Sequence, residues 1–441
     1  MNKYENTVTE SDKNVDTFKI ASKIRDLAIS HNKLFEESIP LIASENLLSP
    51  LAKEMLITDF HSRYAEGLPK ERYYEGNRFV DEVELEAIEL AKKLFNVDFA
   101  DVRPTSGTVA NLAVLKAFAK HGDKIATVSL DDGAHISTAE FGAFGVRGVN
   151  PVFMPFNRDE MNIDIDNTKK VILNEKPNIV LFGLSLFLFP PPIKELADTI
   201  KEVGAMGWYD GAHVLGLIAG GKFQDPLHEG CNVLSASTHK TFPGPQHGIL
   251  LASGMEENQY KKLRSGAFPG VTSNHHLHAM ASLAITLVEE IEFGKKYAEA
   301  MINNAKALGE SLYNKNFKVL CPDKEFTESH TIAINVHDLG GGEICAKKLE
   351  ESGIIVNKNM LPGDKSAKHP DGIRIGTPEI TRLGMNKSDM NIIAEFIKRI
   401  LIDGIAPSII KKEITDFKRS HNKISYCFYE GENPYKYYRL V

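Results

Sequence analysis

The sequence is poor in cysteine, in long apolar runs and in positive charge. Its four cysteines are scattered along 441 residues without a Cys-x-x-Cys pair, which argues against a disulfide framework or a structural zinc site. The most apolar run, residues 179–189, is too short to cross a bilayer. A net charge of −7 gives no electrostatic basis for binding nucleic acid or an anionic membrane. Residues 1–14 lack the apolar core of a secretory signal, so we expect a cytoplasmic protein without nucleic-acid or membrane partners.

The chain is too long for one ordinary hydrophobic core, so we expect more than one domain. An amphipathic pattern over residues 17–38, with Ile20, Ile24, Leu27 and Ala28 on one face, predicts a helical arm. The expected division is an N-terminal helical arm in residues 1–50, a large α/β domain in residues 51–299 and a small C-terminal α+β domain in residues 300–441.

Short apolar runs alternate with helical patterns through the middle of the chain. Strands are predicted at residues 124–128, 152–154, 179–185, 207–209 and 233–237, and helices at residues 81–95 and 194–203. Such alternation is typical of a mostly parallel sheet covered by helices. The small domain is predicted from helical patterns at 277–312 and 389–401 and from strand patterns at 331–336 and 353–356.

Three polar residues of the large domain follow strand-like runs. Ser185, Asp210 and Lys240 each lie at or just beyond the predicted end of a strand. Because ligands bind at the carboxyl ends of parallel strands, we expect the three to face one crevice. A lysine that forms an imine must lose its proton, and a carboxylate keeps a pyridinium nitrogen protonated. The pair indicates pyridoxal phosphate (PLP), although a lysine by residue type alone is usually a solvated surface group.

Other stretches suit the same cofactor but have ordinary alternatives. Residues 104–111 precede an apolar helix at 112–119 and form either a phosphate cradle or a simple helix cap. His135 either stacks on a cofactor ring or is an ordinary turn residue. Arg374 either binds a carboxylate through both guanidinium nitrogens or is a surface residue of a strand. The histidines at 275–278 have no neighbouring cysteine or carboxylate that completes a metal site, so no metal is expected.

Several stretches together resemble serine hydroxymethyltransferase, a fold-type-I PLP-dependent transferase. They are Leu-Ile-Ala-Ser-Glu-Asn at 41–46, Arg-Tyr-Ala-Glu-Gly at 63–67, Arg-Tyr-Tyr at 72–74, Ser-Gly at 106–107, Ser-Thr-His-Lys-Thr at 237–241 and Gly-Ile-Arg at 372–374. Their order and spacing are specific, and the resemblance covers residues 41–397. It implies a seven-stranded type of mostly parallel sheet, a smaller C-terminal domain and PLP as the cofactor.

The resemblance implies roles for individual residues around the cofactor. Lys240 would form the covalent link, Asp210 would pair with the pyridinium nitrogen and His135 would stack on the ring. The other cofactor contacts that it implies are Ser106, Gly107, Thr108, Ser185, His213, Ser237 and His239.

The resemblance also implies a substrate site for serine, glycine and a reduced pterin. Arg374 and Ser44 would bind the amino-acid carboxylate, and Glu66 would be the acid/base group with Tyr64 beside it. The implied pterin contacts are Tyr73, Tyr74 and Asn359. In this family the segment with Tyr64 and Glu66 reaches across a dimer interface, which implies a homodimer with shared active sites. The implied reaction is reversible transfer of the serine hydroxymethyl carbon to the pterin, leaving glycine.

Departures from the common family pattern leave the carbon carrier open. Residues 244–248 read Gly-Pro-Gln-His-Gly where most members have Gly-Pro-Arg-Gly-Gly. Stretches at 268–276 and 327–330 resemble the archaeal-type branch, which can use tetrahydromethanopterin in place of tetrahydrofolate. Two other hypotheses remain: a pterin-independent β-hydroxy-amino-acid (threonine-type) aldolase or transaldolase, and a non-catalytic protein of this fold. Retention of Glu66, Tyr73 and Tyr74 favours the hydroxymethyltransferase.

Overall fold

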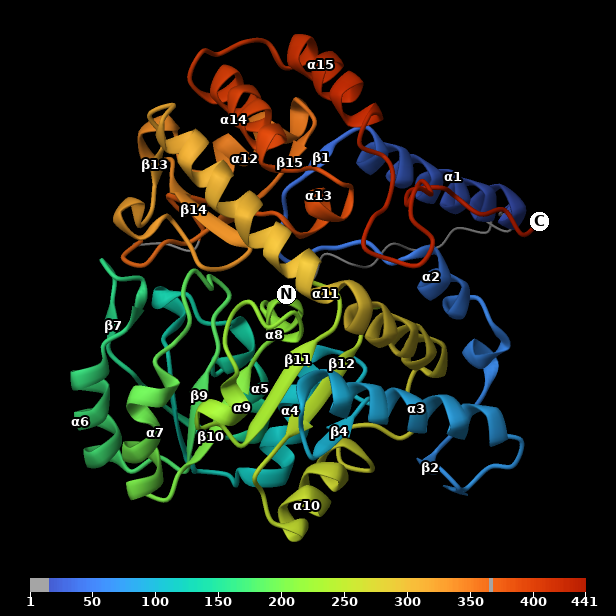
Figure 1. The fold of residues 1–441 in the computed structure, drawn as a ribbon, viewed down its shortest axis with the longest axis vertical. Helices are drawn as coiled ribbons and strands as arrows, with labels where there is room; N and C mark the ends of the chain where they lie inside the picture. The colour runs from blue at the N-terminus through green and yellow to red at the C-terminus, as the bar shows by residue number, and fades with distance from the viewer. Residues whose placement is uncertain (1–15, 365–367) are drawn as a thin grey trace, which may run out of the picture.

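A seven-stranded sheet forms the centre of the larger part of the computed structural model, which describes residues 16–364 and 368–441 (Figure 1). The strand order is β4-β12-β11-β10-β9-β5-β6, and only β12 runs antiparallel to its neighbours in this sheet. The strands are β4 (Phe99–Asp101), β5 (Lys124–Thr127), β6 (Asn150–Phe153), β9 (Ile179–Phe182), β10 (Met206–Asp210), β11 (Val233–Ser237) and β12 (Gly248–Ala252). The mostly parallel sheet is confirmed, and β4 and β12 are two strands that the periodicity did not predict.

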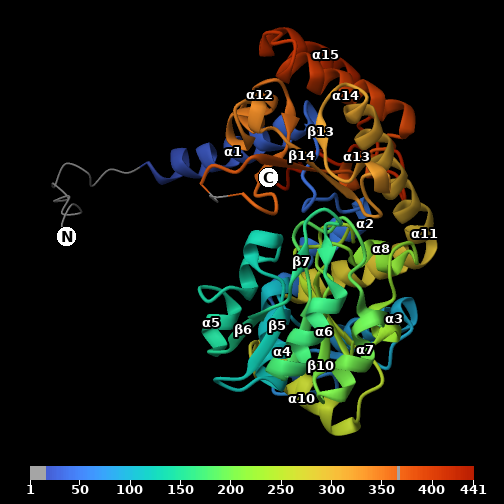
Figure 2. The same ribbon diagram turned by 90° about the vertical axis from the view of Figure 1, so that its left-hand side faces the viewer.

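Helices cover both faces of this sheet (Figures 1 and 2). Helix α3 (Arg78–Phe95) shows why: its buried residues, among them Val80, Ala87 and Ala91, recur at helical spacing. The helix ends where Asn96 adopts a left-handed conformation with φ of 50°. The other helices of this part are α4 (Gly107–Phe118), α5 (Ala143–Arg147), α6 (Ile165–Glu175), α7 (Ile193–Glu202), α8 (Leu215–Ala219), α9 (Pro226–Glu229) and α10 (Glu257–Ala267).

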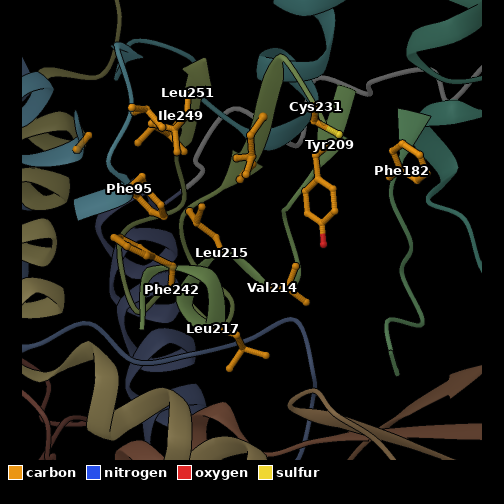
Figure 3. Packing of buried hydrophobic residues seen from close by; sticks show 14 of the residues in the cluster. Phe95, Phe182, Tyr209, Val214, Leu215, Leu217, Cys231, Phe242, Ile249 and Leu251 are labelled. Atoms are coloured by element: carbon orange, nitrogen blue, oxygen red, sulfur yellow. The ribbon is translucent and has the colours of Figure 1, made fainter. Parts of the chain in front are cut away.

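The main core packs beneath the strands that lead to the crevice. Figure 3 shows Phe95 beside Phe242 with Leu215 close to them, and Val214 nearer to Tyr209. The Phe95 and Phe242 rings are stacked with centroids 6.4 Å apart. Burial of each such side chain contributes about 1.5–3 kcal/mol to stability. This packing holds the loops after β10 and β11 against a rigid base.

A second body contains a four-stranded antiparallel sheet in the order β13-β14-β17-β16. Its strands are β13 (Lys318–Val319), β14 (Thr331–Asn335), β17 (Gly372–Gly376) and β16 (Asn357–Asn359). Its helices are α12 (Gly342–Glu351), α13 (Pro378–Arg382), α14 (Lys387–Leu401) and α15 (Pro407–Arg419). Strand β1 (Ile39–Pro40) pairs in parallel with β15 (Ile354–Ile355), so the chain before the large sheet also packs into this second core.

Helix α11 (Leu277–Tyr313) connects the two bodies (Figure 1). Its residues up to Met301 belong to the core beneath the large sheet, and those from Ala305 belong to the second core. Because one continuous helix is shared, the two bodies are held against each other. The region where Arg374 of the second body meets Ser185 of the large body is here called the crevice.

The predicted N-terminal helix is α1 (Thr17–Glu36), which projects from the body of the molecule (Figure 2). None of its residues is buried, and the predicted apolar face is exposed, with Ile24 at 64%. Residues 1–15 of the expected arm lie outside the described residues. Other short elements are α2 (Pro50–Leu56), β2 (Gly67–Leu68), β3 (Glu71–Arg72), β7 (Phe156–Asn157) and β8 (Asn162–Ile163). No helix in the described ranges is long and apolar enough to cross a membrane.

Candidate active site

Lys240 lies in the loop after β11 and is only 9% exposed. Burial lowers the pKa of its amine to about 8; the nearby Arg374 cation lowers the pKa further, while the Asp210 carboxylate opposes both. The side-chain amide of Asn46 donates to the Lys240 carbonyl oxygen at 2.6 Å and fixes the backbone there. The structure therefore presents Lys240 as an amine that is easily deprotonated near neutral pH.

Asp210 ends β10 and is held from two sides. One carboxylate oxygen accepts from the Ala212 backbone N–H at 3.1 Å, and the other accepts from the Asn111 amide at 2.8 Å. Gly183 lies so close that an added Cβ would be 2.8 Å from the Asp210 Cβ. These contacts fix a buried carboxylate at the carboxyl edge of the sheet, where a ring nitrogen can meet it.

Residues 107–111 of the stretch 104–111 form the start of α4, so the helix begins five residues before the predicted apolar stretch at 112. The earlier start has a simple cause, because Ser106 caps the helix by accepting from the Val109 N–H at 3.1 Å. A Cβ on Gly107 would lie 3.0 Å from the Ser237 Cβ, so glycine allows the helix to approach the end of β11. The first amides of a helix lack partners within the helix and can bind a phosphate, and Thr108 is exposed beside them.

Arg374 reaches the crevice from the second body. It lies on β17, is buried, and donates to the Ser185 carbonyl oxygen at 2.7 Å and to the Asn357 side chain at 3.2 Å. Burial lowers its pKa to about 10, so the guanidinium stays charged at neutral pH. Asn359 lies on β16, the strand next to Arg374, and is half-buried.

Three histidines surround these charges as neutral rings. Burial lowers the pKa of His135 and of His213, and Lys240 and Arg374 add to the effect; for His135 the Asp210 carboxylate opposes it. Burial, with a contribution from Lys240, lowers the pKa of His239 to about 4. His213 is fully enclosed, and its Nδ1 has no hydrogen-bond partner within the described residues. A buried polar atom without a partner inside this crevice fits a site that receives a polar ligand.

The half-buried Ser44 lies in a segment tied to both bodies. The His330 ring, 6.1 Å from that of His213, donates from Nε2 to the Ala43 carbonyl oxygen at 3.1 Å. Two residues on, Asn46 bonds to Lys240 as described above. Ser44 therefore lies between Ala43, which contacts the second body, and Asn46, which contacts the loop of Lys240.

The segment of residues 64–74, here called the tyrosine segment, lies apart from this crevice. Tyr73 is 77% exposed, and the Tyr64 and Tyr74 rings lie 4.8 Å apart. Glu66 is half-buried. In the described part of the chain, no hydrogen bond, ion pair or ring contact joins this segment to Lys240, Asp210 or Arg374. Within one chain the structure therefore does not bring the two groups of predicted site residues together.

The tyrosine segment nevertheless has a fixed shape. Arg72 donates to the Ala65 and Gly67 carbonyl oxygens, both at 2.7 Å, and pairs with Glu84 at 2.6 Å. The Asn77 amide donates to the Tyr64 and Tyr74 carbonyl oxygens, both at 3.0 Å. These clamps hold the segment rigid although its tyrosines face outward.

The histidines at 275–278 have packing roles in this chain. His275 is buried 3.1 Å from Glu84, and the rings of His278 and His61 lie 4.6 Å apart. No group of three or more histidine, cysteine, aspartate or glutamate side chains in residues 16–364 and 368–441 is placed to hold a metal ion. Gln246 and His247, which replace the Arg-Gly of the common family pattern, differ in burial. Gln246 is exposed, whereas His247 is buried and hydrogen-bonded to the Val102 carbonyl oxygen at 2.8 Å.

Lys240 and Asp210 are buried and lie at the carboxyl ends of two neighbouring strands, β11 and β10. A family model described as serine hydroxymethyltransferase matches residues 19–397. A serine hydroxymethyltransferase of Thermoplasma volcanium is 53% identical, covering 96% of this chain and 100% of that protein. One of Methanothermobacter marburgensis is 51% identical, covering 95% and 98%. The chain belongs to the serine hydroxymethyltransferase family.

The fold is also similar to that of a solved transaldolase. The crystal structure of L-threonine transaldolase from Pseudomonas fluorescens matches with a TM-score of 0.86 at 25% identity, covering 93% of this chain and 94% of that one. The expected fold class, the PLP dependence and the serine hydroxymethyltransferase activity are confirmed at the level of the family.

Sequence reasoning missed the side chains that position the site. Asn46 lies within the matched stretch 41–46, and Asn111 ends the stretch 104–111, yet neither received a role. Arg72 lies in the matched stretch 72–74, but its position as a clamp depends on Glu84 and on backbone carbonyls. Only a three-dimensional arrangement reveals these partners, because they are distant in sequence or belong to the main chain.

Proposed function

We propose that this chain transfers the hydroxymethyl carbon of serine to a reduced pterin, with Lys240 as the lysine that binds PLP covalently. The observation that carries the proposal is the convergence of three buried groups on one crevice: the Lys240 amine, the Asp210 carboxylate and the Arg374 guanidinium. PLP supplies an electron sink for the bond that is broken at the amino acid. The protein supplies binding, orientation and proton transfer.

The residues present suit this cofactor. The Asp210 carboxylate, already held by Asn111 and Ala212, would keep the pyridine nitrogen protonated. His135 would stack on the ring, and the unpartnered His213 Nδ1 offers a polar atom to the ring substituents. The residues that would complete the cofactor site are Ser106, Gly107 and Thr108 for the phosphate, with Ser185, Ser237 and His239 around the ring.

Arg374 and Ser44 would bind the carboxylate of serine or glycine. A charged guanidinium in a largely buried position binds a carboxylate through two parallel hydrogen bonds. Because Arg374 comes from the second body and the lysine from the large one, an amino acid bound to both is oriented by two rigid supports. That orientation selects which bond at the amino-acid carbon is broken.

The tyrosine segment would act in the crevice of a second copy of the chain. Tyr64 and Glu66 would face the serine hydroxymethyl group and the pterin, with Glu66 moving the proton, and Tyr73, Tyr74 and Asn359 would contact the pterin. The fixed shape and outward tyrosines of this segment support a homodimer with shared sites. The exposed apolar face of α1 supports the same arrangement.

We propose tetrahydrofolate or tetrahydromethanopterin as the carbon carrier. The competing reaction is a pterin-independent aldolase or transaldolase, and the fold similarity to an L-threonine transaldolase is the observation in its favour. The higher identity of relatives named serine hydroxymethyltransferase favours the pterin-dependent reaction.

The test is glycine release from serine, measured with no pterin and with each reduced pterin in turn. We expect turnover that depends on a pterin, and the pterin with the higher kcat/KM names the carrier. Threonine cleavage measured alongside provides the comparison between reactions. Serine cleavage at full rate without any pterin would instead establish the aldolase.

Two further proposals concern the whole chain. The division into an arm, a large domain and a small domain near residue 300 is supported by the two separate cores that share α11. A cytoplasmic location is supported by the four free thiols, Cys231, Cys321, Cys345 and Cys427.

A further inference from the structure

A buried hydrogen-bond network connects two residues of the proposed cofactor site through one asparagine. Asn111 lies in α4 and is 3% exposed. Its Nδ2 lies 2.8 Å from an Asp210 oxygen and 3.2 Å from the Ser137 Oγ. Its Oδ1 accepts from the Ser235 hydroxyl at 2.6 Å. Ser235 in turn accepts from the indole N–H of Trp208 at 2.8 Å.

The direction of every hydrogen bond in this network is determined. Trp208 can only donate, so Ser235 accepts from it and directs its own hydrogen to the Asn111 Oδ1. The amide N–H₂ then faces the Asp210 carboxylate, which needs donors. The opposite amide orientation would place two oxygens 2.8 Å apart. The geometry and the chemistry therefore agree on one orientation.

The second N–H of Asn111 extends this order to His135. It donates to the Ser137 Oγ, which lies 2.9 Å from the His135 Nδ1. The Ser137 backbone N–H donates to the same Nδ1 at 3.2 Å. An Nδ1 that accepts from a backbone N–H carries no proton, so the Ser137 hydroxyl also donates to it and the neutral ring is protonated on Nε2.

We propose that Asn111 is a positioning residue that fixes two features at once, the acceptor orientation of the Asp210 carboxylate and the Nε2-protonated tautomer of His135. The proposal deepens the proposed function and rests on the roles given there to Asp210 and His135. Trp208 and Ser235 anchor the amide from the strand side, and Trp208 faces the same side of β10 as Asp210.

The first experiment reads the tautomer in the cofactor-free full chain by ¹⁵N NMR of ¹⁵N-histidine-labelled protein. The signal of His135 is identified by its loss in His135→Gln. We expect the shifts of an Nε2–H ring in the wild type and a mixture of tautomers in Ser137→Ala and Asn111→Ala. A His135 protonated on Nδ1 in the wild type would overturn the proposal.

The second experiment measures PLP affinity by quenching of Trp208 fluorescence, since Trp208 is the only tryptophan of the chain. Loss of one hydrogen bond to a charged group predicts an affinity about 10- to 100-fold weaker in Asn111→Ala. The larger loss is expected for Asn111→Asp, which places a second carboxylate against Asp210. Asn304→Ala is the matched control, because Asn304 is an equally buried asparagine whose amide bonds to Thr381 and Met385 outside the crevice.

Asp210→Asn distinguishes a failure of the positioning role of Asn111 from a failure of the function proposed for Asp210. Weaker PLP binding in Asp210→Asn with unchanged binding and tautomer in Asn111→Ala would refute only the positioning role. Unchanged PLP binding in Asp210→Asn would refute the function proposed for Asp210 itself. Ser137→Ala keeps the test decisive if the Asn111 variants do not fold, because it removes only a hydroxyl group.

Discussion

The two halves of the proposed active site differ in how far a single chain completes them. In the crevice, Lys240, Asp210 and Arg374 are buried, and each makes a hydrogen bond with a distant segment of the chain. In the tyrosine segment, the backbone is clamped by Arg72 and Asn77, but the tyrosine side chains face outward. A rigid backbone with exposed aromatic side chains is typical of a surface that binds another protein surface.

The difference has an electrostatic consequence. Charges act strongly on one another only where water is excluded, and the shifted pKa values of the site cluster on the crevice side. The tyrosine segment can reach such an environment only when another surface covers it. The comparison therefore supports the proposal that bond-making chemistry belongs to the crevice of one chain and that a second copy completes the site.

The largest effect is expected from Lys240→Ala. Removal of the amine proposed to bind PLP covalently should lower serine turnover by at least about 10³-fold. Borohydride reduction followed by mass spectrometry should attach PLP to residue 240 of the wild type and leave the variant unlabelled. Lys261→Ala, at an exposed lysine 4.0 Å from Glu257, is the control and should keep full activity. Labelling of another lysine in active wild type would contradict the assignment.

An intermediate effect is expected from mixing variants of the two halves. Lys240→Ala and Glu66→Gln should each be inactive alone, because each destroys one half of every site. Refolded together as random dimers, they should regain about one quarter of wild-type activity, since half of the dimers contain one intact site of two. Activity measured against mixing ratio checks this arrangement.

A matched mixture makes this prediction specific. Lys240→Ala mixed with Arg374→Ala should stay inactive, because both changes lie in the crevice of the same chain and neither dimer site is intact. Recovery in that control, or none in the first mixture, would show that the tyrosine segment does not act across two chains.

The same division explains what the sequence could predict. Lys240, Asp210 and Ser185 were predicted to converge because each follows a strand, and strand ends of a parallel sheet meet at one edge. Helices α3, α7 and α11 were predicted by their apolar spacing to within a few residues. The local sequence pattern was sufficient to predict a residue's position where that position depends only on the helix or strand that contains the residue.

The remaining features depend on contacts between distant segments. Strand β12 follows the lysine loop without a helix between, so no alternation marks it, and β4 is only three residues long. Helix α4 begins at Gly107 because of a cap and a close approach to Ser237, which hydropathy does not register. The roles of Asn46 and Asn111 require partners 194 and 99 residues away.

The smallest effect is a shift of pH dependence that tests the crevice alone. Because the neutral amine reacts and the pKa of Lys240 is about 8, the rate of PLP uptake by the cofactor-free enzyme should rise roughly tenfold from pH 7 to pH 9 and then level off. An ordinary lysine would continue to gain up to much higher pH. Stopped-flow absorbance measures the rate, and the rate with free Nα-acetyl-lysine corrects for the ionisation of PLP itself.

Two variants should move this pH midpoint in opposite directions. Arg374→Gln removes a cation that lowers the pKa of Lys240, so the midpoint should rise. Asp210→Asn removes the carboxylate that raises it, so the midpoint should fall. Tyr73→Phe, a change in the exposed segment, should leave the midpoint where it is. Equal shifts in all three variants would mean that the pKa of Lys240 is not controlled by the charges of its own crevice, and the contrast between the two halves would then lose its electrostatic basis.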